Sequence, residues 1–394
     1  MFQFFQRRAL TTIIFFLSFL MTKAWGSNGI TYEMKADQWT TTGEVEFSAA
    51  DDSFPQGLMT IKKGSAYLKG IEFENGTIEY DVKIATQGSN LQFRQRSADT
   101  AEKLYVRTSE DCPAAKDCLQ YTPVTHGLML WDTFPQYQHS APIKLNAWNH
   151  FKFVISGKRM TVFVNGVATL SVARLEGDAM RGGLQLGGTC SYANFTVTPD
   201  AVEDLSPEPL KDVAEGDEHY LQHWQVSQPV DWPSVTNSVL QASVGKDPDY
   251  VSRPDNNDDW QAIGAERGGL VNLSRQYGAL TDGKKISLTW LKTTIESDVV
   301  QAKQVQMGWL DEVWVFVNGK LIFADRNLWD IAGAKKAPDG RLALTNGTFN
   351  LPLQKGKNEI LVAIDNNVPD GNSHHFGWGL EMRLTDLTSL KTNP

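Results

Sequence analysis

The chain has 394 residues, which is enough for two domains of ordinary size. Its 46 acidic and 37 basic residues give a formal net charge of -9 at pH 7. An acidic surface argues against nucleic acid and against an anionic membrane as partners, because both are themselves negatively charged. Neutral ligands, sugars among them, remain open.

The first 26 residues predict a secretory signal peptide. Arg7 and Arg8 precede an apolar run over residues 9–21, and Ala24-Trp25-Gly26 supplies a small-residue cleavage site before Ser27. The run is too short to cross a bilayer, which needs about 20 apolar residues. No later stretch has the length and composition of a membrane span. We therefore expect a secreted or periplasmic protein that starts at Ser27.

Residues 27–199 read as one domain of short strands joined by turns, with almost no segment able to form a long helix. Residues 77–84 and 91–96 alternate between apolar and polar side chains, as half-buried strands do. Further runs rich in β-branched and aromatic residues lie at 103–107, 127–131 and 151–155. These patterns predict an antiparallel β-sandwich.

The sequence Val-Phe-Val-Asn-Gly occurs twice, at 162–166 and at 315–319. Each copy is a β-rich run that stops at Asn-Gly and resumes with further apolar residues. Asn and Gly both tolerate the positive φ angles of a type I′ turn, so each copy predicts a β-hairpin. One hairpin in each half predicts an all-β chain of two tandem antiparallel β-sandwich (jelly-roll) domains.

The strand before the second hairpin has two apolar faces. Val313, Val315 and Val317 fall on one face, and Trp314 and Phe316 fall on the other. A strand that is apolar on both sides is expected in the middle of a sheet whose two faces are covered. We therefore place this strand centrally in the second domain.

The three cysteines suggest one disulfide bond and one buried thiol. Cys112 and Cys118 bracket a short loop in a chain bound for an oxidising compartment, which favours a local disulfide over two free thiols. A metal site is disfavoured there, since no histidine or second cysteine pair lies nearby. Cys190 reads as a small buried residue rather than a nucleophile, because no histidine occurs between Phe151 and Gly216.

Four segments of the first domain carry a family resemblance: Gly-Thr-Ile-Glu-Tyr-Asp-Val at 76–82, Leu-Gln-Phe-Arg at 91–94, Trp-Asn-His-Phe-Lys-Phe at 148–153, and Gly-Gly-Leu-Gln-Leu at 182–186. Together with the first hairpin they resemble the concanavalin-like jelly rolls. Within these they are similar to laminin-G-like domains and to the 3-keto-disaccharide hydrolase-like domain of bacterial secreted proteins. The resemblance implies a concave face on which sugars lie.

The composition changes at residues 200–218, which are rich in Asp and Glu, hold Pro207 and Pro209, and lack apolar periodicity. We expect a solvated acidic linker and a domain boundary there. The linker separates the first sandwich from a second domain, predicted over residues 219–386 and followed by a tail at 387–394.

The second domain resembles a different family. Its strand and turn at 313–323, the run at 353–366 and the alternating segment at 378–384 together are similar to the galactose-binding-like jelly roll. That fold is found as an accessory domain in β-galactosidases and other polysaccharide-degrading enzymes. The resemblance implies sugar binding.

Catalytic carboxylates are hard to find in the first domain. Laminarinase-like enzymes of this fold place an acid and a nucleophile on one strand, in the pattern Glu-x-Asp-x-x-Glu or Glu-x-Asp-x-Glu. Glu79 and Asp81 match the first two positions, but Lys83 follows and the second Glu is missing. The pattern favours reading Glu79 and Asp81 as ordinary outward residues of an alternating strand. With Asp99, they are the catalytic candidates.

Binding candidates in the first domain come from even spacing along strands, which places side chains on one face. Guanidinium and amide groups beside aromatic rings suit sugar recognition. The alternative is that these side chains simply form the solvent-exposed outer face of the sandwich. The candidates are Gln92, Arg94 and Arg96 on one strand, Tyr105 and Arg107 on another, and Trp131 and Tyr137 as aromatic platforms.

Two loops of the second domain add binding candidates. Trp260 and Glu266 lie in one turn-rich loop, and His375 and Trp378 lie in or just after the other. The alternative for each tryptophan is burial in the core. We predict no metal site, because the ligands needed at zinc spacing are missing. We expect no cofactor; calcium at a domain rim is compatible with both folds, although no run of ligands indicates it.

The leading hypothesis from the sequence is a secreted carbohydrate-binding protein whose partner is a polysaccharide or an oligosaccharide. One alternative is a glycoside hydrolase or polysaccharide lyase with its active site in the first domain. Another is an adhesion module that binds no sugar. No pattern in the sequence indicates an oligomeric state.

Overall fold

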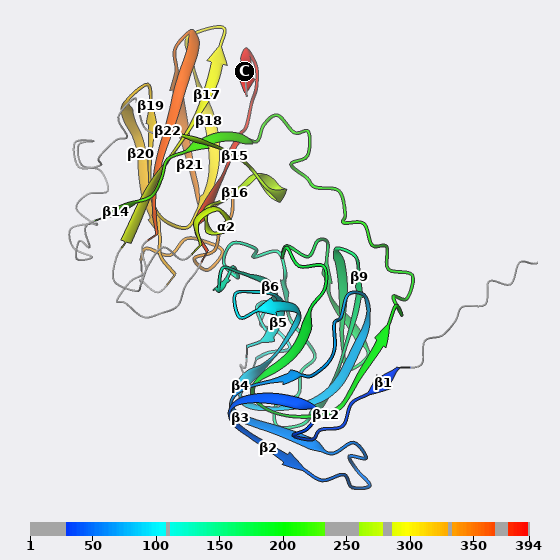
Figure 1. The fold of residues 1–394 in the computed structure, drawn as a ribbon. Coiled ribbons are helices and arrows are strands. Elements are labelled where there is room, and N and C mark those ends of the chain that lie inside the picture. Colours follow the sequence, from blue (N-terminus) through cyan, green and yellow to red (C-terminus); the bar gives the residue numbers. More distant parts are fainter. Residues whose placement is uncertain are drawn as a thin grey trace, which may run out of the picture.

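The structure is a computed structural model, and it describes residues 29–107, 111–232, 260–278, 286–329, 333–366 and 377–392. Their regular secondary structure is almost entirely β-strand, which confirms the all-β class, and they form two lobes (Figure 1). No helix among them is long and apolar enough to cross a membrane. The predicted signal peptide lies outside the described residues.

The first domain is one strongly curved antiparallel sheet that folds over its own core. Its main path runs β11-β10-β9-β4-β12-β3-β2, with β5 and β6 continuing from β4. The strands are β1 (Ile30–Thr31), β2 (Trp39–Ser48), β3 (Leu58–Leu68), β4 (Gly76–Ser97), β5 (Thr100–Val106), β6 (Leu119–Thr125), β7 (Leu128–Met129), β8 (Gln138–His139), β9 (Trp148–Ser156), β10 (Arg159–Val164), β11 (Val167–Val172) and β12 (Gly183–Pro199).

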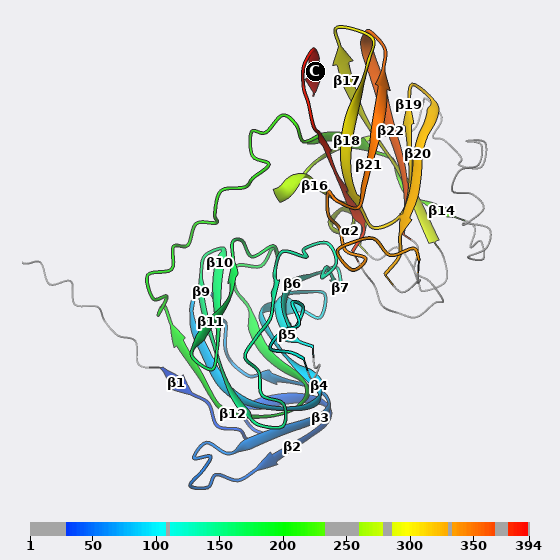
Figure 2. The same cartoon turned by 180° about the vertical axis from the view of Figure 1, so that it is seen from behind.

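The long strand β4 joins the two layers of this domain. Its first part, up to Lys83, pairs with β9, and its second part, from Asn90, pairs with β5. Ile78 and Tyr80 from the first part and Leu91 and Phe93 from the second all enter one core. Both views place β5 and β6 at the end of the first domain that faces the second domain (Figures 1 and 2).

The second domain is a sandwich of two antiparallel sheets. The larger runs β15-β13-β17-β22-β19-β20 with β14 and β24 beside β17, and the smaller runs β16-β23-β18-β21. The elements are β13 (His223–Val226), β14 (Val230–Trp232), β15 (Gln261–Gly264), η2 (Arg267–Gly269), β16 (Leu270–Asn272), α2 (Leu273–Tyr277), β17 (Ile286–Ser297), β18 (Gln301–Trp309), β19 (Asp311–Val317), β20 (Lys320–Asn327), β21 (Gly347–Leu353), β22 (Gly356–Asn366), β23 (Gly379–Leu384) and β24 (Leu390–Thr392).

Both predicted hairpins are present, and they share a second device. Asn165 and Asn318 have φ angles of 52° and 49°, each followed by a glycine with positive φ. The side chain of Asn165 donates to Asn149 Oδ1 (3.0 Å), and that of Asn318 donates to Asn358 Oδ1 (2.9 Å). The Asn149 side chain in turn donates to the backbone of the turn before β9, and the Asn358 side chain donates to the backbone of the turn before β22. The same asparagine pair therefore fixes a hairpin to its neighbouring strand in both domains.

Strand β19 has two buried faces, as its sequence predicts. Val313, Val315 and Val317 pack in the core between the two sheets, whereas Trp314 and Phe316 pack in a second apolar cluster on the other side. That second cluster also contains Leu288 and Trp290 of β17.

The acidic linker lies along the first domain. Its side chains are mostly exposed, as expected, but its backbone is bound at several points. Pro207 O accepts from Lys158 N (2.9 Å), and Leu210 N donates to Ala173 O (3.0 Å). The linker is therefore held on the first domain rather than extended through solvent.

A pair of buried carboxylates lies on the neighbouring strands β19 and β22. Glu312 and Asp365 are each 0% exposed, and Glu312 N donates to Asp365 Oδ1 (2.8 Å). Among the residues that the structure describes, neither Glu312 carboxylate oxygen nor Asp365 Oδ2 has a hydrogen-bond partner. Burial raises the pKa of Glu312 to about 7, and burial together with the Glu312 charge raises the pKa of Asp365 well above its usual value.

This pair makes the free energy of unfolding depend on pH. Because the folded-state pKa values are raised, the folded chain keeps protons that the unfolded chain releases, so stability is present at acid pH and is lost as pH rises through about 7. Replacing Asp365→Asn should raise the free energy of unfolding at pH 8 and reduce its fall between pH 5 and 9. Urea unfolding across that range measures this, with the exposed Asp298→Asn as control. Equal profiles for Asp365→Asn and the control would contradict it.

Candidate functional site

Three of the predicted binding residues, Tyr105, Arg107 and Trp131, contact one another beside the outward face of β5 and β6. Leu104 and Val106 of β5 enter the core. Because side chains alternate along a strand, Lys103, Tyr105 and Arg107 face outward. The strand register places Tyr105 opposite Gln120 of β6. Tyr105 Oη donates to Gln120 Oε1 (3.2 Å), and Gln120 Nε2 donates to Trp131 O (2.6 Å).

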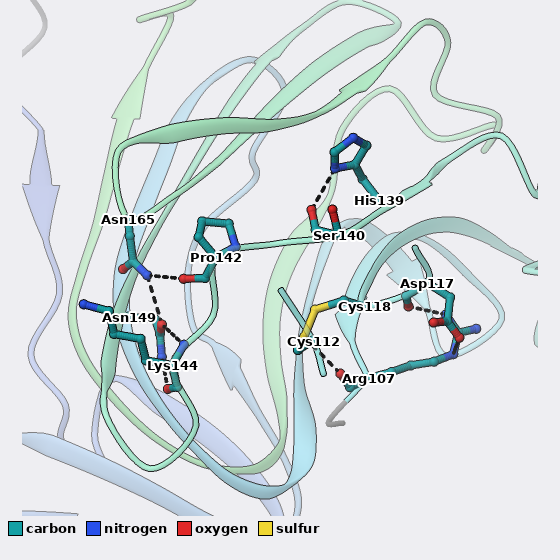
Figure 3. The surroundings of a disulfide bond; sticks show 10 residues. All are labelled: Arg107, Cys112, Asp117, Cys118, His139, Ser140, Pro142, Lys144, Asn149 and Asn165. Atoms are coloured by element: carbon teal, nitrogen blue, oxygen red, sulfur yellow. Dashed lines mark hydrogen bonds and ion pairs between the residues drawn. A yellow bond between two sulfur atoms is a disulfide. The ribbon is translucent and has the colours of Figure 1, made fainter. Parts of the chain in front are cut away.

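Arg107 lies at the centre of this face. Its guanidinium carbon is 4.8 Å from the centroid of the Tyr105 ring and 5.6 Å from that of the Trp131 ring. Arg107 Nη2 donates to Tyr105 Oη (2.6 Å), and Nη1 donates to Asp117 O (2.9 Å). Asp117 is in the loop that the Cys112–Cys118 disulfide closes, directly beside Arg107 (Figure 3). The disulfide therefore limits where the Asp117 carboxylate can lie.

The second domain contributes two side chains to the same place. The Arg341 guanidinium carbon is 5.2 Å from the centroid of the Trp131 ring, and Arg341 Nη2 is 3.8 Å from Asp117 Oδ2. The Trp329 ring meets the Trp131 ring edge to face, with 5.5 Å between centroids. We call this group the Trp131 cluster: Tyr105, Arg107, Asp117, Trp131, Trp329 and Arg341.

The cluster has a buried floor and an open side. Trp131 is 7% exposed, and the Arg341 side chain is 5% exposed. Trp329 is 40% exposed, and the Arg107 and Asp117 side chains keep 30% and 39% of their surface. A ligand could therefore contact an indole ring, a guanidinium group and a carboxylate together.

Two hydrogen bonds to Asp132, one to its backbone and one to its carboxylate, connect the two domains beside the cluster. Asp132 O accepts from Leu342 N (2.9 Å), and Asp132 Oδ1 accepts from Gly377 N (2.9 Å). Burial raises the pKa of Asp132 to about 6. Leu342 itself packs in the core of the first domain. The contact is thus both polar and apolar.

The row predicted on β4 is wrong in its geometry. Arg94 has a φ angle of 50° and is 0% exposed, because the chain bulges there and turns its side chain inward. Its guanidinium donates to Glu74 O and Gly157 O instead. Arg96 is exposed on the surface near Glu72. Gln92 remains on the outward face, opposite residue 103 of β5.

Tyr137 and Glu266 belong to a second contact between the domains. Tyr137 Oη donates to Glu176 Oε1 (2.7 Å), and burial raises the pKa of Glu176 to about 7. Arg275 of α2 donates to Glu266 Oε1 (2.6 Å) and to Glu176 O (2.7 Å). Because Tyr137 is only 2% exposed, it serves packing here and is not an open platform.

The remaining candidates of the second domain lie elsewhere. Trp378 is 1% exposed in the domain core, so its prediction as a contact residue is wrong. Trp260 packs on Lys292, whose Nζ is 4.1 Å from the indole centroid. Lys292 also lines an open cavity of about 480 Å³ with His223, Gln225 and Glu359. His375 lies outside the described residues.

The catalytic candidates do not frame a free space. His150 Nδ1 is 2.8 Å from Asp81 Oδ1, and His150 Nε2 is 3.5 Å from Glu79 Oε1. Asn194 Nδ2 also donates to Asp81 (2.7 Å). Both carboxylates thus bind one imidazole, while Asp99 lies exposed in the turn after β4. In the part of the chain that the structure describes, no group of three or more His, Cys, Asp or Glu could hold a metal ion.

Sequence reasoning missed Asp117, Asp132, Trp329 and Arg341. Asp117 could have been predicted, because the short loop closed by the Cys112–Cys118 disulfide follows the strand that carries Tyr105 and must stay close to it. Trp329 and Arg341 could not have been predicted. Alternation along a strand shows which side chains share a face of one sheet, but it does not show which loops of two domains come together.

Close packing at Gly377 should be required for this domain contact. A Cβ atom there would lie 1.8 Å from Thr133 Oγ1. We expect Gly377→Ala to lower the free energy of unfolding by about 1–3 kcal/mol and to increase the solvent exposure of Trp131. Tryptophan fluorescence during urea unfolding measures both.

Adding Thr133→Ala to Gly377→Ala should restore part of the loss, because the nearest clashing atom is removed. Gly264→Ala is the control, since its Cβ would meet nothing within 4 Å. If Gly377→Ala behaves like Gly264→Ala, the contact at Asp132 and Thr133 does not hold the domains.

Comparison with known proteins shows which family the first domain resembles. Residues 30–198 match the family described as the 3-keto-alpha-glucoside-1,2-lyase-like domain. No curated protein matches the chain.

Among solved structures, the carbohydrate-binding module CBM66 from Bacillus subtilis is 16% identical, with a TM-score of 0.29, covering 42% of this chain and 93% of that one. The β-glucanase of Bacillus licheniformis is 9% identical, with a TM-score of 0.30, covering 44% and 98%. At these values the structural likeness adds no argument about function. The fold and the family match together show that residues 30–198 form a concanavalin-like β-sandwich similar to the 3-keto-alpha-glucoside-1,2-lyase-like domain.

Proposed function

We propose that the protein binds a polysaccharide or an oligosaccharide at the Trp131 cluster. The observation that carries this proposal is that an exposed indole, two guanidinium groups and a carboxylate from both domains meet at one place. Indole rings stack on the apolar faces of sugar rings, and guanidinium and carboxylate groups bind hydroxyls at fixed angles. Sites between two domains are also a common location for ligands.

The cluster is arranged for binding before any ligand arrives. Both guanidinium groups, of Arg107 and Arg341, pack on the Trp131 ring, which limits how far each can move. The Asp117 carboxylate lies 3.9 Å from Arg107 Nε and 3.8 Å from Arg341 Nη2, which reduces the repulsion between the two cations. A site whose polar groups are already fixed loses less entropy when it binds.

The family match supports a sugar as the ligand, since the matched family is described by its relation to an alpha-glucoside. The predicted signal peptide supports a secreted or periplasmic location, where polysaccharides are met. We extend both points to this chain as part of the proposal.

Loss of the exposed indole should weaken saccharide binding without unfolding the protein. We expect Trp329→Ala to lower affinity about tenfold or more for a glycan first identified on an array, because about 1.4 kcal/mol of stacking corresponds to that factor. Isothermal titration calorimetry with the full chain measures it.

Trp148→Ala is the matched control, since Trp148 is a partly exposed indole on β9 that packs against Phe54, away from the cluster. Equal losses for both variants, or none for Trp329→Ala, would place the binding site elsewhere. If the full chain binds other proteins but no glycan on the array, an adhesion module is favoured instead.

Cleavage of the bound saccharide in the first domain is a second candidate function. The family description favours it, and so does a lysine on the outward face of β5, Lys103, that has no carboxylate partner among the described residues. Glu79 and Asp81 are engaged with His150, so Glu79→Gln with Asp81→Asn should leave any product release unchanged. Chromatography of glycans incubated with each variant tests this. If the double variant no longer releases product, Glu79 and Asp81 are again candidates for the catalytic carboxylates.

A further inference from the structure

Arg341 is a buried cation that the protein does not fully satisfy. Its side chain is 5% exposed, and its Nε atom is buried with no hydrogen-bond partner among the residues that the structure describes. The Asp117 carboxylate is near, but its Oδ2 atom lies 3.8 Å from Arg341 Nη2, which is too long for a hydrogen bond. Buried charged groups in proteins are normally hydrogen-bonded. Arg341 therefore keeps the capacity to donate to an acceptor that a ligand brings.

A second guanidinium lies close to the first. Arg107 and Arg341 both pack on the Trp131 ring, with 5.6 Å and 5.2 Å between guanidinium carbon and ring centroid. The same Asp117 oxygen lies 3.9 Å from Arg107 Nε, so one carboxylate stands between two cations without a hydrogen bond at either distance. Burial, and after it the charge of Arg107, lowers the pKa of Arg341. The pair has more positive charge and more N–H donors than Asp117 satisfies.

Two further carboxylates beside the cluster are bound to other protein atoms. Asp132 Oδ1 accepts from Gly377 N (2.9 Å), and Asp339 Oδ1 accepts from Lys335 Nζ (2.9 Å). Lys335 in turn lies over the Trp329 ring, with Nζ 5.5 Å from its centroid. Although the whole chain has a formal net charge of -9, this cluster presents cationic donors beside an exposed indole. An anionic group on a ring-shaped ligand fits that combination.

We propose that the ligand of the Trp131 cluster is an acidic saccharide whose carboxylate binds Arg107 and Arg341. This inference rests on the proposed function, because the cluster must first hold a sugar ring. A guanidinium presents its N–H groups in a planar fork that matches the two oxygens of a carboxylate. The substrate class is a polysaccharide or oligosaccharide that contains uronic acid. A sulfate ester carries the same charge, and the test separates it from a carboxylate.

The test is isothermal titration calorimetry of the full chain with oligomers of galacturonate, glucuronate and mannuronate, each beside its methyl ester. The ester keeps the ring and its hydroxyls but removes the charge. We expect at least one acid to bind, and its ester to bind at least about tenfold more weakly, because charge-assisted hydrogen bonds are lost. Sodium chloride should weaken binding of the acid more than that of the ester. Tighter binding of sulfated galactan oligomers than of every uronate would overturn the carboxylate as the recognised group.

Variants locate the preference for the acid. Arg341→Met and Arg107→Met should each reduce the ratio of acid to ester affinity at least about tenfold. Arg96→Met is the matched control, since Arg96 is an exposed arginine near Glu72, and it should leave that ratio unchanged.

A purely structural role for Arg341 gives a different result. Because Met keeps an apolar side chain against Trp131 and removes an unsatisfied buried charge, Arg341→Met should not lower the free energy of unfolding in urea. A lower free energy of unfolding with an unchanged acid-to-ester ratio would overturn the proposal. If Arg341→Met does not fold, the ratio measured for Arg107→Met decides.

The two proposals fail in different ways. If no acid, ester or neutral glycan binds the full chain, the proposed saccharide site fails and this inference fails with it. If glycans bind and Trp329→Ala weakens them, but acid and ester bind equally, the saccharide site stands and the inference of an acidic saccharide alone is overturned.

Discussion

The hydrogen bonds that Asp132 accepts from the second domain are the constraint on which the candidate site depends. Leu342 N and Gly377 N both donate to this one residue, and Leu342 inserts into the core of the first domain. This contact brings Arg341 onto the Trp131 ring and Trp329 against its edge. Without it, Tyr105, Arg107 and Trp131 would form only half of the cluster. The site is a property of the assembled pair of domains.

The first domain prepares its half through features within the sheet. Alternation along β5 turns Tyr105 and Arg107 outward while Leu104 enters the core, and the disulfide loop brings Asp117 to Arg107. The bulge at Arg94 has the opposite effect, since it removes one guanidinium from the surface and uses it to bind the backbone at Glu74 and Gly157. Two arginines on neighbouring strands thus have different roles, one structural and one available to a ligand.

Much of the fold follows from short patterns in the sequence. The two Asn-Gly turns, the two-faced strand β19 and the outward face of β5 are all local, because they depend on backbone angles or on period-2 spacing. The bulge at Arg94 broke that spacing, so the predicted row of Gln92, Arg94 and Arg96 does not exist. The position of Arg341 over Trp131 depends on docking of two domains, which no local pattern encodes. Burial of Trp378 was the alternative that the sequence left open.

The measurement that tests the central claim most directly is an NMR titration of the indole N–H signals of the full chain with a bound glycan. The account predicts that the signals of Trp131 and Trp329, one from each domain, shift together with a single dissociation constant. It also predicts that Trp148, on β9, does not shift. A shift confined to Trp260, beside the cavity of the second domain, would contradict a site shared between the two domains.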